Sequence, residues 1–150
     1  EQRTAGNTIK SSSPFIKTTY EGILITCKEK WHKGKGVSTI SGREFTEYVN
    51  GSWDIIPQHK QKTQATFPEE LPYRCIQLLS FLDDIVLDPF SGSGTTCCVA
   101  KRLGRRYIGF ELEESFYKFS LARLDSIKKD DEVIKERTTK KIIQKQQKFW

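Results

Sequence analysis

The sequence contains no methionine, not even at its first position, and only two of its 150 residues are histidines. Its four cysteines form no Cys-x-x-Cys pair, so we expect no metal site, and buried free thiols in a reducing compartment. No stretch approaches the roughly 18 apolar residues that a membrane span needs, and no secretory signal opens the chain. These absences argue against a membrane-spanning chain and predict a cytoplasmic location.

Strong charge of either sign is also absent. The formal net charge is +6, the pI is about 9.1, and 36% of the residues are hydrophobic. A chain of this length can bury roughly two thirds of its unfolded surface, which is enough for one core. Many proteins with such a charge never bind nucleic acid, so composition alone does not decide for or against DNA binding.

The most informative stretch is residues 85–97, which read IVLDPFSGSGTTC. The apolar run 85–87 is typical of a strand in a parallel sheet that is covered on both faces, and it ends at Asp88. Gly92 and Gly94 allow a sharp turn that brings backbone N–H groups close to a ligand, and Thr95-Thr96 opens a helix. This order predicts a site for a nucleotide-like cofactor.

A second strand is predicted at residues 106–111, RYIGFE, about twenty residues further on. It ends in Glu111, at the position where Rossmann-type folds hold a ribose diol. A phosphate-binding P-loop would need a lysine after Gly94, and a dinucleotide fingerprint would need a third glycine at Cys97. ATP hydrolysis is therefore disfavoured, and a dehydrogenase is a remote alternative. An acid at each strand end suits S-adenosylmethionine, which has a cationic methionine-like end and a ribose.

These residues carry a family resemblance that extends over residues 3 to 126 and is most specific between 67 and 111. The chain resembles the C-terminal half of bacterial β-class DNA amino-methyltransferases of restriction-modification systems. The segments that carry it are VLDPFSGSGTT (86–96), LGRRYIGFE (103–111), Ala122-Arg123-Leu124, GSWDIIP (51–57) and FPEELPYR (67–74).

The resemblance implies part of a three-layer α/β Rossmann-like sandwich that binds S-adenosylmethionine. It also implies methyl transfer to the exocyclic amine of a flipped adenine, in preference to cytosine, with double-stranded DNA as the partner. Asp88 would face the cationic end of the cofactor and Glu111 the ribose. For Phe67, contact with the methionine end and a hydrophobic staple remain equal alternatives. The candidate cofactor-binding residues are Phe67, Pro68, Asp88, Pro89, Phe90, Ser91, Gly92, Gly94, Thr95, Thr96 and Glu111.

The catalytic motif of that family is missing, so no catalytic residue is named. The motif, Asp/Asn/Ser-Pro-Pro followed by an aromatic residue, needs two adjacent prolines, and no two of the five prolines are adjacent. Ser13-Pro14-Phe15 and Asp88-Pro89-Phe90 only approximate it. We expect the motif in an unseen N-terminal half or in a second polypeptide. A second polypeptide or a homodimer partner is also considered as a binding partner. A module that binds DNA without catalysis is a further alternative.

Three regions are predicted: a connector and DNA-recognition region (1–62), a core that binds S-adenosylmethionine (63–126) and a basic tail (127–150). A strand is expected at 22–27. In the first region the resemblance implies that Lys28, Lys30, Lys33 and Lys35 contact DNA phosphates. Arg105 and Arg106 are expected to be solvated or to lie near the C-terminus of the preceding helix, with a DNA contact as the alternative.

Helices are predicted from about 66, from 95 to 103 with Gly104 as its C-cap, and from about 113. The residues expected to be buried on the first and last of these are Leu71, Cys75, Leu78, Leu79, Leu82, Phe116, Phe119, Ala122 and Leu124.

Overall fold

The computed structural model describes residues 20–29, 34–56 and 67–127, and the chain divides into two units, Glu1–Gly34 and Lys35–Trp150. In the first unit the described residues are exposed and form no regular element. The strand expected at 22–27 is therefore wrong. Its apolar residues match a strand pattern, but a strand forms only when a neighbour accepts its hydrogen bonds, and none does so among the described residues.

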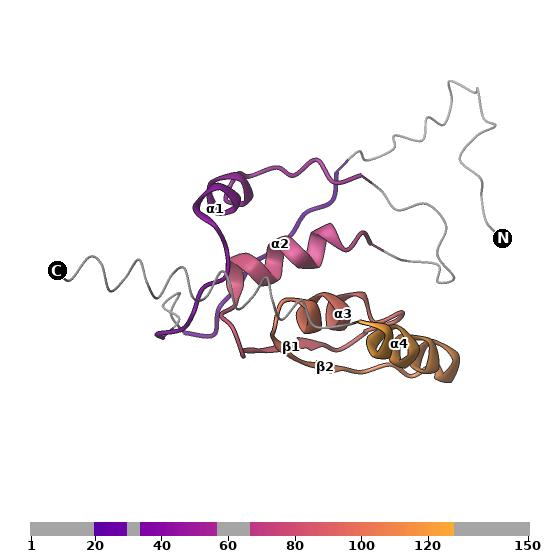
Figure 1. Cartoon of the computed structure of the whole chain (residues 1–150). Coiled ribbons are helices and arrows are strands. Elements are labelled where there is room, and N and C mark those ends of the chain that lie inside the picture. Colours follow the sequence, from indigo (N-terminus) through magenta and orange to yellow (C-terminus); the bar gives the residue numbers. More distant parts are fainter. Residues whose placement is uncertain (1–19, 30–33, 57–66, 128–150) are drawn as a thin grey trace, which may run out of the picture. The chain divides into compact units, whose positions relative to one another are not determined.

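All helices and strands of the described residues belong to the second unit (Figure 1). A parallel β-α-β unit lies at its centre. Strand β1 (Ile85–Asp88) pairs with strand β2 (Arg106–Gly109) in the register Ile85 to Arg106, and helix α3 (Thr95–Arg102) connects the two. The predicted order of strand, glycine turn, helix and strand is thus confirmed, as is the C-terminal glycine of α3, because Gly104 has φ +72°.

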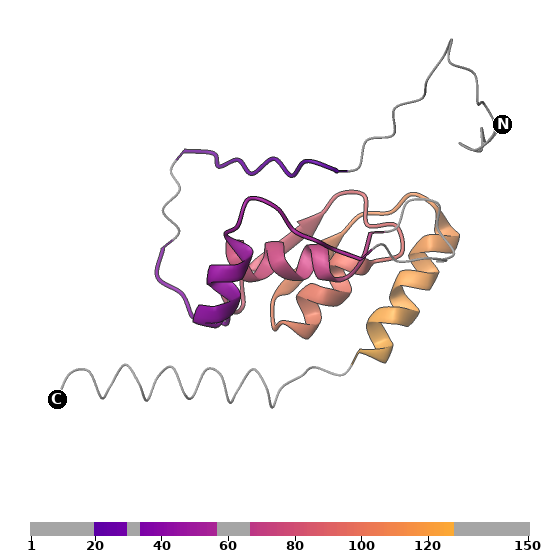
Figure 2. The same ribbon diagram turned by 90° about the horizontal axis from the view of Figure 1, so that it is seen from above.

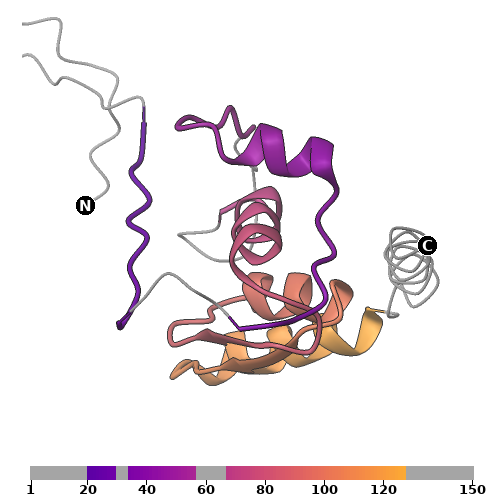
Figure 3. The same ribbon diagram turned by 90° about the vertical axis from the view of Figure 1, so that its left-hand side faces the viewer.

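Three more helices complete the unit: α1 (Gly42–Tyr48), α2 (Glu70–Leu79) and α4 (Glu114–Ser126). In Figures 1 and 3, α3 lies between α2 and the two strands, and it also contacts α4. Viewed from above, α1 lies at one end of α2 and crosses its direction (Figure 2). Among the described residues no helix is long and apolar enough to cross a membrane.

Two clusters of buried side chains form the core around α3. The first consists of Ile76, Val99, Ala100 and Leu103, with Tyr73, Val86 and Tyr107 packed against it. The second consists of Cys97, Cys98 and Leu124, with Tyr107 and Ile127 packed against it. The side chains of α3 thus hold the strands, α2 and α4 together.

Only one face of the two-stranded sheet is covered in the described part of the chain. Val86 and its register partner Tyr107 pack against α3. Side chains alternate along a strand, so Ile85, Leu87 and Ile108 project from the other face, where they are 54%, 56% and 45% exposed. The expectation that this strand is covered on both faces is not met among the described residues, because α3, which contacts both strands, lies on the Val86 side.

The buried faces of α2 and α4 also differ from the predicted ones. Helix α2 begins at Glu70, later than predicted, and buries Ile76 and Gln77, whereas Leu79 is exposed. Helix α4 buries Leu124 as predicted, whereas Ala122 is not among its buried residues. The hydrophobic periodicity identifies each helix correctly, but the elements packed against the helix determine which of its faces is buried.

Arg105 is buried, which corrects the expectation that it is solvated. Its guanidinium donates hydrogen bonds to the Leu103 carbonyl (2.7 Å), the Ser80 carbonyl (2.8 Å) and the Thr39 hydroxyl (2.7 Å). The Thr39 hydroxyl in turn donates to the buried Gln77 side chain at 2.6 Å. Arg105 therefore ties the end of α2 to the segment before α1 and does not face solvent.

Candidate cofactor site

The carboxyl ends of β1 and β2 bring Asp88 and Glu111 to one edge of the sheet. The strands are parallel, and Asp88 is in register with Gly109, two residues before Glu111. Beyond the strands the chains stay joined, because the Phe110 N–H donates to the Asp88 carbonyl (3.0 Å) and the Ser91 N–H donates to the Phe110 carbonyl (2.8 Å). The two predicted acids are therefore held near each other by the backbone ladder.

The glycine turn needs its glycines for two different reasons. Gly92 and Gly94 have φ +50° and +76°, a region that other residues enter only with strain. A Cβ on Gly94 would lie 2.8 Å from the Cβ of Ser120 on α4, whereas a Cβ on Gly92 would meet nothing within 4 Å. The turn is thus packed tightly against α4 at Gly94 and is open at Gly92, where a ligand can approach the backbone.

The Glu111 carboxylate caps this turn. It accepts hydrogen bonds from the Gly92 N–H at 2.7 Å and from the Glu113 N–H at 2.8 Å. These backbone donors, that of Glu113 first, hold the pKa of Glu111 below its usual value. A carboxylate has about four lone-pair sites, so it retains acceptor capacity for hydroxyl donors such as a ribose diol.

Asp88 shapes the start of the turn. One of its carboxylate oxygens accepts a hydrogen bond from the Phe90 N–H at 3.1 Å. Phe90 itself is 87% exposed, so its ring is free to pack on a ligand. Burial, the nearby charge of Asp88 and the neighbouring Cys98 raise the pKa of the Cys97 thiol to about 11. Cys97 is therefore a packed thiol and not a nucleophile.

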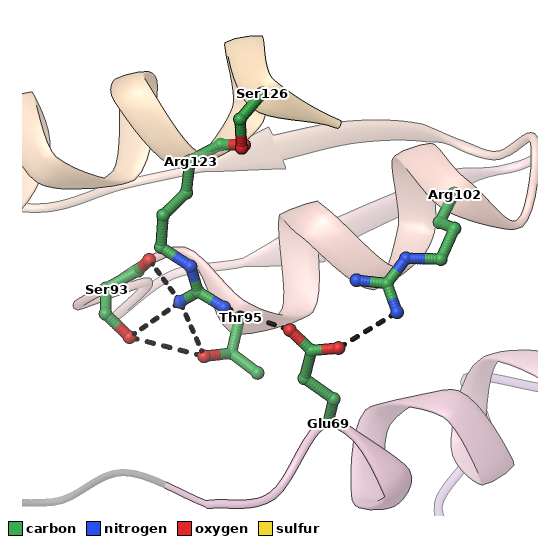
Figure 4. A network of polar contacts seen from close by, with 6 residues as sticks. All are labelled: Glu69, Ser93, Thr95, Arg102, Arg123 and Ser126. Carbon is green, nitrogen blue, oxygen red and sulfur yellow. Dashed lines mark hydrogen bonds and ion pairs between the residues drawn. The ribbon is translucent and has the colours of Figure 1, made fainter. Parts of the chain in front are cut away.

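A polar network places the segment before α2 next to the glycine turn (Figure 4). Arg123 on α4 donates to the Ser93 carbonyl (2.8 Å) and, at 3.2 Å, to the Ser93 and Thr95 hydroxyls. Its other terminal nitrogen contacts Glu69 at 3.1 Å, and Glu69 also pairs with Arg102 at 2.9 Å. Phe67 and Pro68 directly precede Glu69 in the chain, and Phe67 is 38% exposed.

Sequence reasoning misses this network. From the sequence, Glu69 is an acid that favours a helix N-terminus, and Arg123 is only part of the family resemblance. The two are 54 positions apart, and no local pattern signals such a pair. The remaining candidates sit around the turn: Thr95 is buried at the start of α3, Pro89 is exposed, and Ser91 and Thr96 are partly exposed.

The predicted DNA-contacting lysines are divided between the units. Lys28 lies in the first unit and Lys35 in the second, and both are exposed. Lys30 and Lys33 lie outside the described residues, as does most of the predicted tail. Among the described residues, no three His, Cys, Asp or Glu side chains are grouped in a way that could hold a metal ion.

Comparison with known proteins identifies relatives of this arrangement. The family model described as DNA methylase, N6_N4_Mtase, matches residues 3–122. The type II methyltransferase M.MjaI of Methanocaldococcus jannaschii is 35% identical over 113 residues, which are 67% of this chain and 37% of that protein. M.HinfI of Haemophilus influenzae is 51% identical over 61 residues, 41% of this chain and 17% of that protein.

A solved structure with the same fold comes from Thermus thermophilus. It is TTHA0409, assigned as a DNA modification methylase and complexed with S-adenosyl-L-methionine. The sequence identity is 38% and the TM-score is 0.51, and the match covers 58% of this chain and 34% of that one. Its selenomethionine form gives a TM-score of 0.55 at 30% identity, covering 69% of this chain and 48% of that one. The fold of the described core is thus part of the expected α/β methyltransferase sandwich. The chain spans less than half the length of these relatives.

Proposed function

Because this chain belongs to the N6/N4 DNA methylase family, we propose that it is the S-adenosylmethionine-binding part of a DNA amino-methyltransferase of a restriction-modification system. We further assign it to the β-class order, in which this part follows the catalytic motif. The enzyme would act on double-stranded DNA in the cytoplasm. The observation that carries the proposal is the meeting of two acids and an open glycine turn at one sheet edge.

Each group at this edge has a defined task in the proposed site. Asp88 offers negative charge to the cationic methionine end, and Glu111 accepts hydrogen bonds from the ribose hydroxyls. The open backbone at Gly92 lets the cofactor approach closely, and the exposed ring of Phe90 packs on it. Phe67 and Pro68, which directly precede the Arg123-bound Glu69, would close the methionine side.

The reaction is a direct transfer. S-adenosylmethionine, when bound, supplies an electrophilic methyl group. The exocyclic amine of a flipped base would attack that methyl in line, so that the new N–C bond forms while the S–C bond breaks. S-adenosylhomocysteine would leave, and the methylated amine would lose a proton. Alignment of the two reactants would contribute most of the acceleration. We propose adenine as the base. Nucleoside analysis of methylated DNA for N6-methyladenine against N4-methylcytosine tests this choice.

Calorimetric titration with S-adenosylmethionine tests the site directly. We expect saturable binding by the wild type, and at least about tenfold weaker binding by Asp88→Asn and Glu111→Gln, because each loses a charged partner of the ligand. Glu114→Gln is the matched control, since the Glu114 side chain is exposed and pairs with the exposed Lys118 on α4. A folded wild type that does not bind, or that prefers a nicotinamide dinucleotide, would contradict the proposal.

We propose that Lys28, Lys30, Lys33 and Lys35 contact DNA phosphates. Each lysine that contacts a phosphate contributes about 0.9 to the slope of log K against log salt concentration. Replacement of one such lysine by glutamine should therefore reduce the slope by about that amount while leaving S-adenosylmethionine affinity unchanged. An unchanged slope for all four variants would remove these lysines from the DNA interface.

A second candidate is that the chain is the cofactor-binding and DNA-recognition piece of a split methyltransferase. The absence of adjacent prolines and the uncovered apolar face of β1 and β2 favour it. In that case labelled methyl transfer to DNA should require addition of a polypeptide that carries the Pro-Pro motif, and Leu87→Asp should prevent the two from associating. Methyl transfer by this chain alone would exclude the split arrangement.

A further inference from the structure

We propose that Arg123 is a positioning residue that sets the affinity for S-adenosylmethionine without touching it, by clamping the glycine turn to the segment before α2. This inference rests on the proposed function. Arg123 comes from α4, the turn connects β1 to α3, and Glu69 directly precedes α2. The clamp therefore joins three parts of the chain, namely α4, the glycine turn and the residue that precedes α2 (Figure 4).

The first half of the clamp fixes one peptide plane of the turn. The Ser93 carbonyl accepts from Arg123 at 2.8 Å, and the Gly94 N–H of the same peptide donates to the Ser91 carbonyl at 2.7 Å. Carbonyl and N–H of a trans peptide point in opposite directions, so the plane is held from both sides. Its orientation in turn determines the direction of the neighbouring Gly92 backbone, which is the open part of the turn.

Two buried hydroxyls share the same nitrogen of Arg123 and also hydrogen-bond to each other at 3.2 Å. Ser93 and Thr95 are only 5% and 4% exposed, and their hydroxyl oxygens each lie 3.2 Å from that nitrogen. Buried polar groups that lose a charged partner incur a desolvation penalty unless they find another. A change at Arg123 is therefore expected to reorganise the turn and not merely to remove a surface charge.

The second half of the clamp places Phe67 and Pro68. The other terminal nitrogen of Arg123 contacts Glu69 at 3.1 Å, and the second carboxylate oxygen of Glu69 pairs with Arg102 at 2.9 Å. Glu69 is thus held between two arginines from two helices. A guanidinium can serve the turn and Glu69 at once because its donors are arranged in a rigid fork, whereas a lysine ammonium is a single point.

The test compares S-adenosylmethionine with adenosine, which lacks the methionine end. Arg123→Lys should raise the Kd for S-adenosylmethionine by about tenfold, the scale of one or two lost charged hydrogen bonds. Glu69→Gln leaves the contacts of Arg123 to the turn intact, so it should weaken S-adenosylmethionine several-fold and change adenosine binding less than twofold. Far-UV circular dichroism and urea unfolding, measured on the same samples, verify that each variant is folded.

Arg74→Lys is the matched control. Arg74 is also a partly buried arginine that pairs with acids, here Glu70 at 2.7 Å and Glu47 at 3.4 Å, and its guanidinium lies over the rings of Tyr48 and Trp53. Its substitution should lower the free energy of unfolding without changing the affinity for either ligand. A purely structural role of Arg123 predicts the same pattern for Arg123→Lys.

The outcomes distinguish failure of the positioning role from failure of the proposed function. Wild-type affinity in folded Arg123→Lys and Glu69→Gln would overturn the positioning role while leaving the proposed function in place. Loss of adenosine and S-adenosylmethionine binding in equal measure in Glu69→Gln would also overturn it. If the wild type binds neither ligand, the proposed function falls and the positioning role falls with it. Should Arg123→Lys fail to fold, Glu69→Gln and Arg102→Lys still test the second half of the clamp.

Discussion

Replacement of Gly94 by alanine should be the most destabilising single methyl addition in the glycine turn. Gly94 has φ +76°, and an L-residue in this region costs about 1–2 kcal/mol. The added Cβ would also lie 2.8 Å from the Cβ of Ser120, and forcing such a contact in a packed site costs about 1–3 kcal/mol more. The total loss of free energy of unfolding should be about 2–5 kcal/mol.

Gly92→Ala provides the comparison that isolates the steric part. Gly92 also has a positive φ, +50°, but its added Cβ would meet nothing within 4 Å. It should lose only the backbone part, about 1–2 kcal/mol. The difference between the two variants is therefore the cost of pushing α4 away from the turn.

Urea unfolding at equilibrium, followed by circular dichroism, measures both variants. The Ser120→Gly background removes the Cβ that Gly94→Ala would strike and leaves the Ser120 Cα at 3.4 Å, an ordinary contact. In a double-mutant cycle the steric part should disappear in that background, although Ser120→Gly itself costs about 1 kcal/mol in a helix. If Gly94→Ala costs no more than Gly92→Ala, the packing of α4 on the turn described here is wrong.

Three further outcomes are expected. Backbone hydrogen bonds hold the pKa of Glu111 low in the folded state. Its contribution to stability is therefore complete above the unfolded pKa of about 4.3 and is lost as the pH falls through the lower folded value. Glu111→Gln should make the fall of the free energy of unfolding with decreasing pH shallower. Burial raises the pKa of Cys97 to about 11, so iodoacetamide at a pH of about 8 should modify exposed Cys27 long before Cys97, as peptide mass spectrometry would show. Val86→Ala should cost about 1–2 kcal/mol in urea unfolding and Leu87→Ala clearly less, because only Val86 packs against α3; equal losses would contradict the one-sided sheet.

The parts of the fold that could be predicted from the sequence are those with a local cause. The order from Ile85 to Glu111 follows from residue types that allow few alternatives: an apolar run, two glycines that permit positive φ, and a second strand followed by an acid. The strand itself ends at Gly109, two residues earlier than predicted. Parallel pairing then brings Asp88 and Glu111 to one edge without any further information. Chemistry and spacing alone therefore suffice to locate the candidate site.

The errors concern features that depend on a neighbour. Residues 22–27 have the composition of a strand but no partner strand among the described residues. A surface position is the ordinary expectation for Arg105, yet four acceptors surround its guanidinium, three of them from other segments. Arg123 and Glu69 meet only after α4 has folded against the turn, so neither residue carries a local signal of the clamp.

The uncovered apolar face of β1 and β2 suggests which steps this chain can perform alone and which need a second polypeptide. Val86 and Leu87 point to opposite faces of the sheet. The face with Val86 is covered by α3, whereas the opposite face exposes Leu87 of β1 and Ile108 of β2. Asp88, Glu111 and the turn follow the carboxyl ends of these strands. They are held by backbone hydrogen bonds, by the Glu111 carboxylate and by Arg123. Cofactor binding can therefore be a property of this chain, whereas the proposed methyl transfer needs the Pro-Pro motif that the chain lacks. A polypeptide that supplies this motif and covers Leu87 and Ile108 would bring the flipped base and the cofactor into one site. Its association should raise the affinity for S-adenosylmethionine only moderately, whereas methyl transfer to DNA should occur only in its presence.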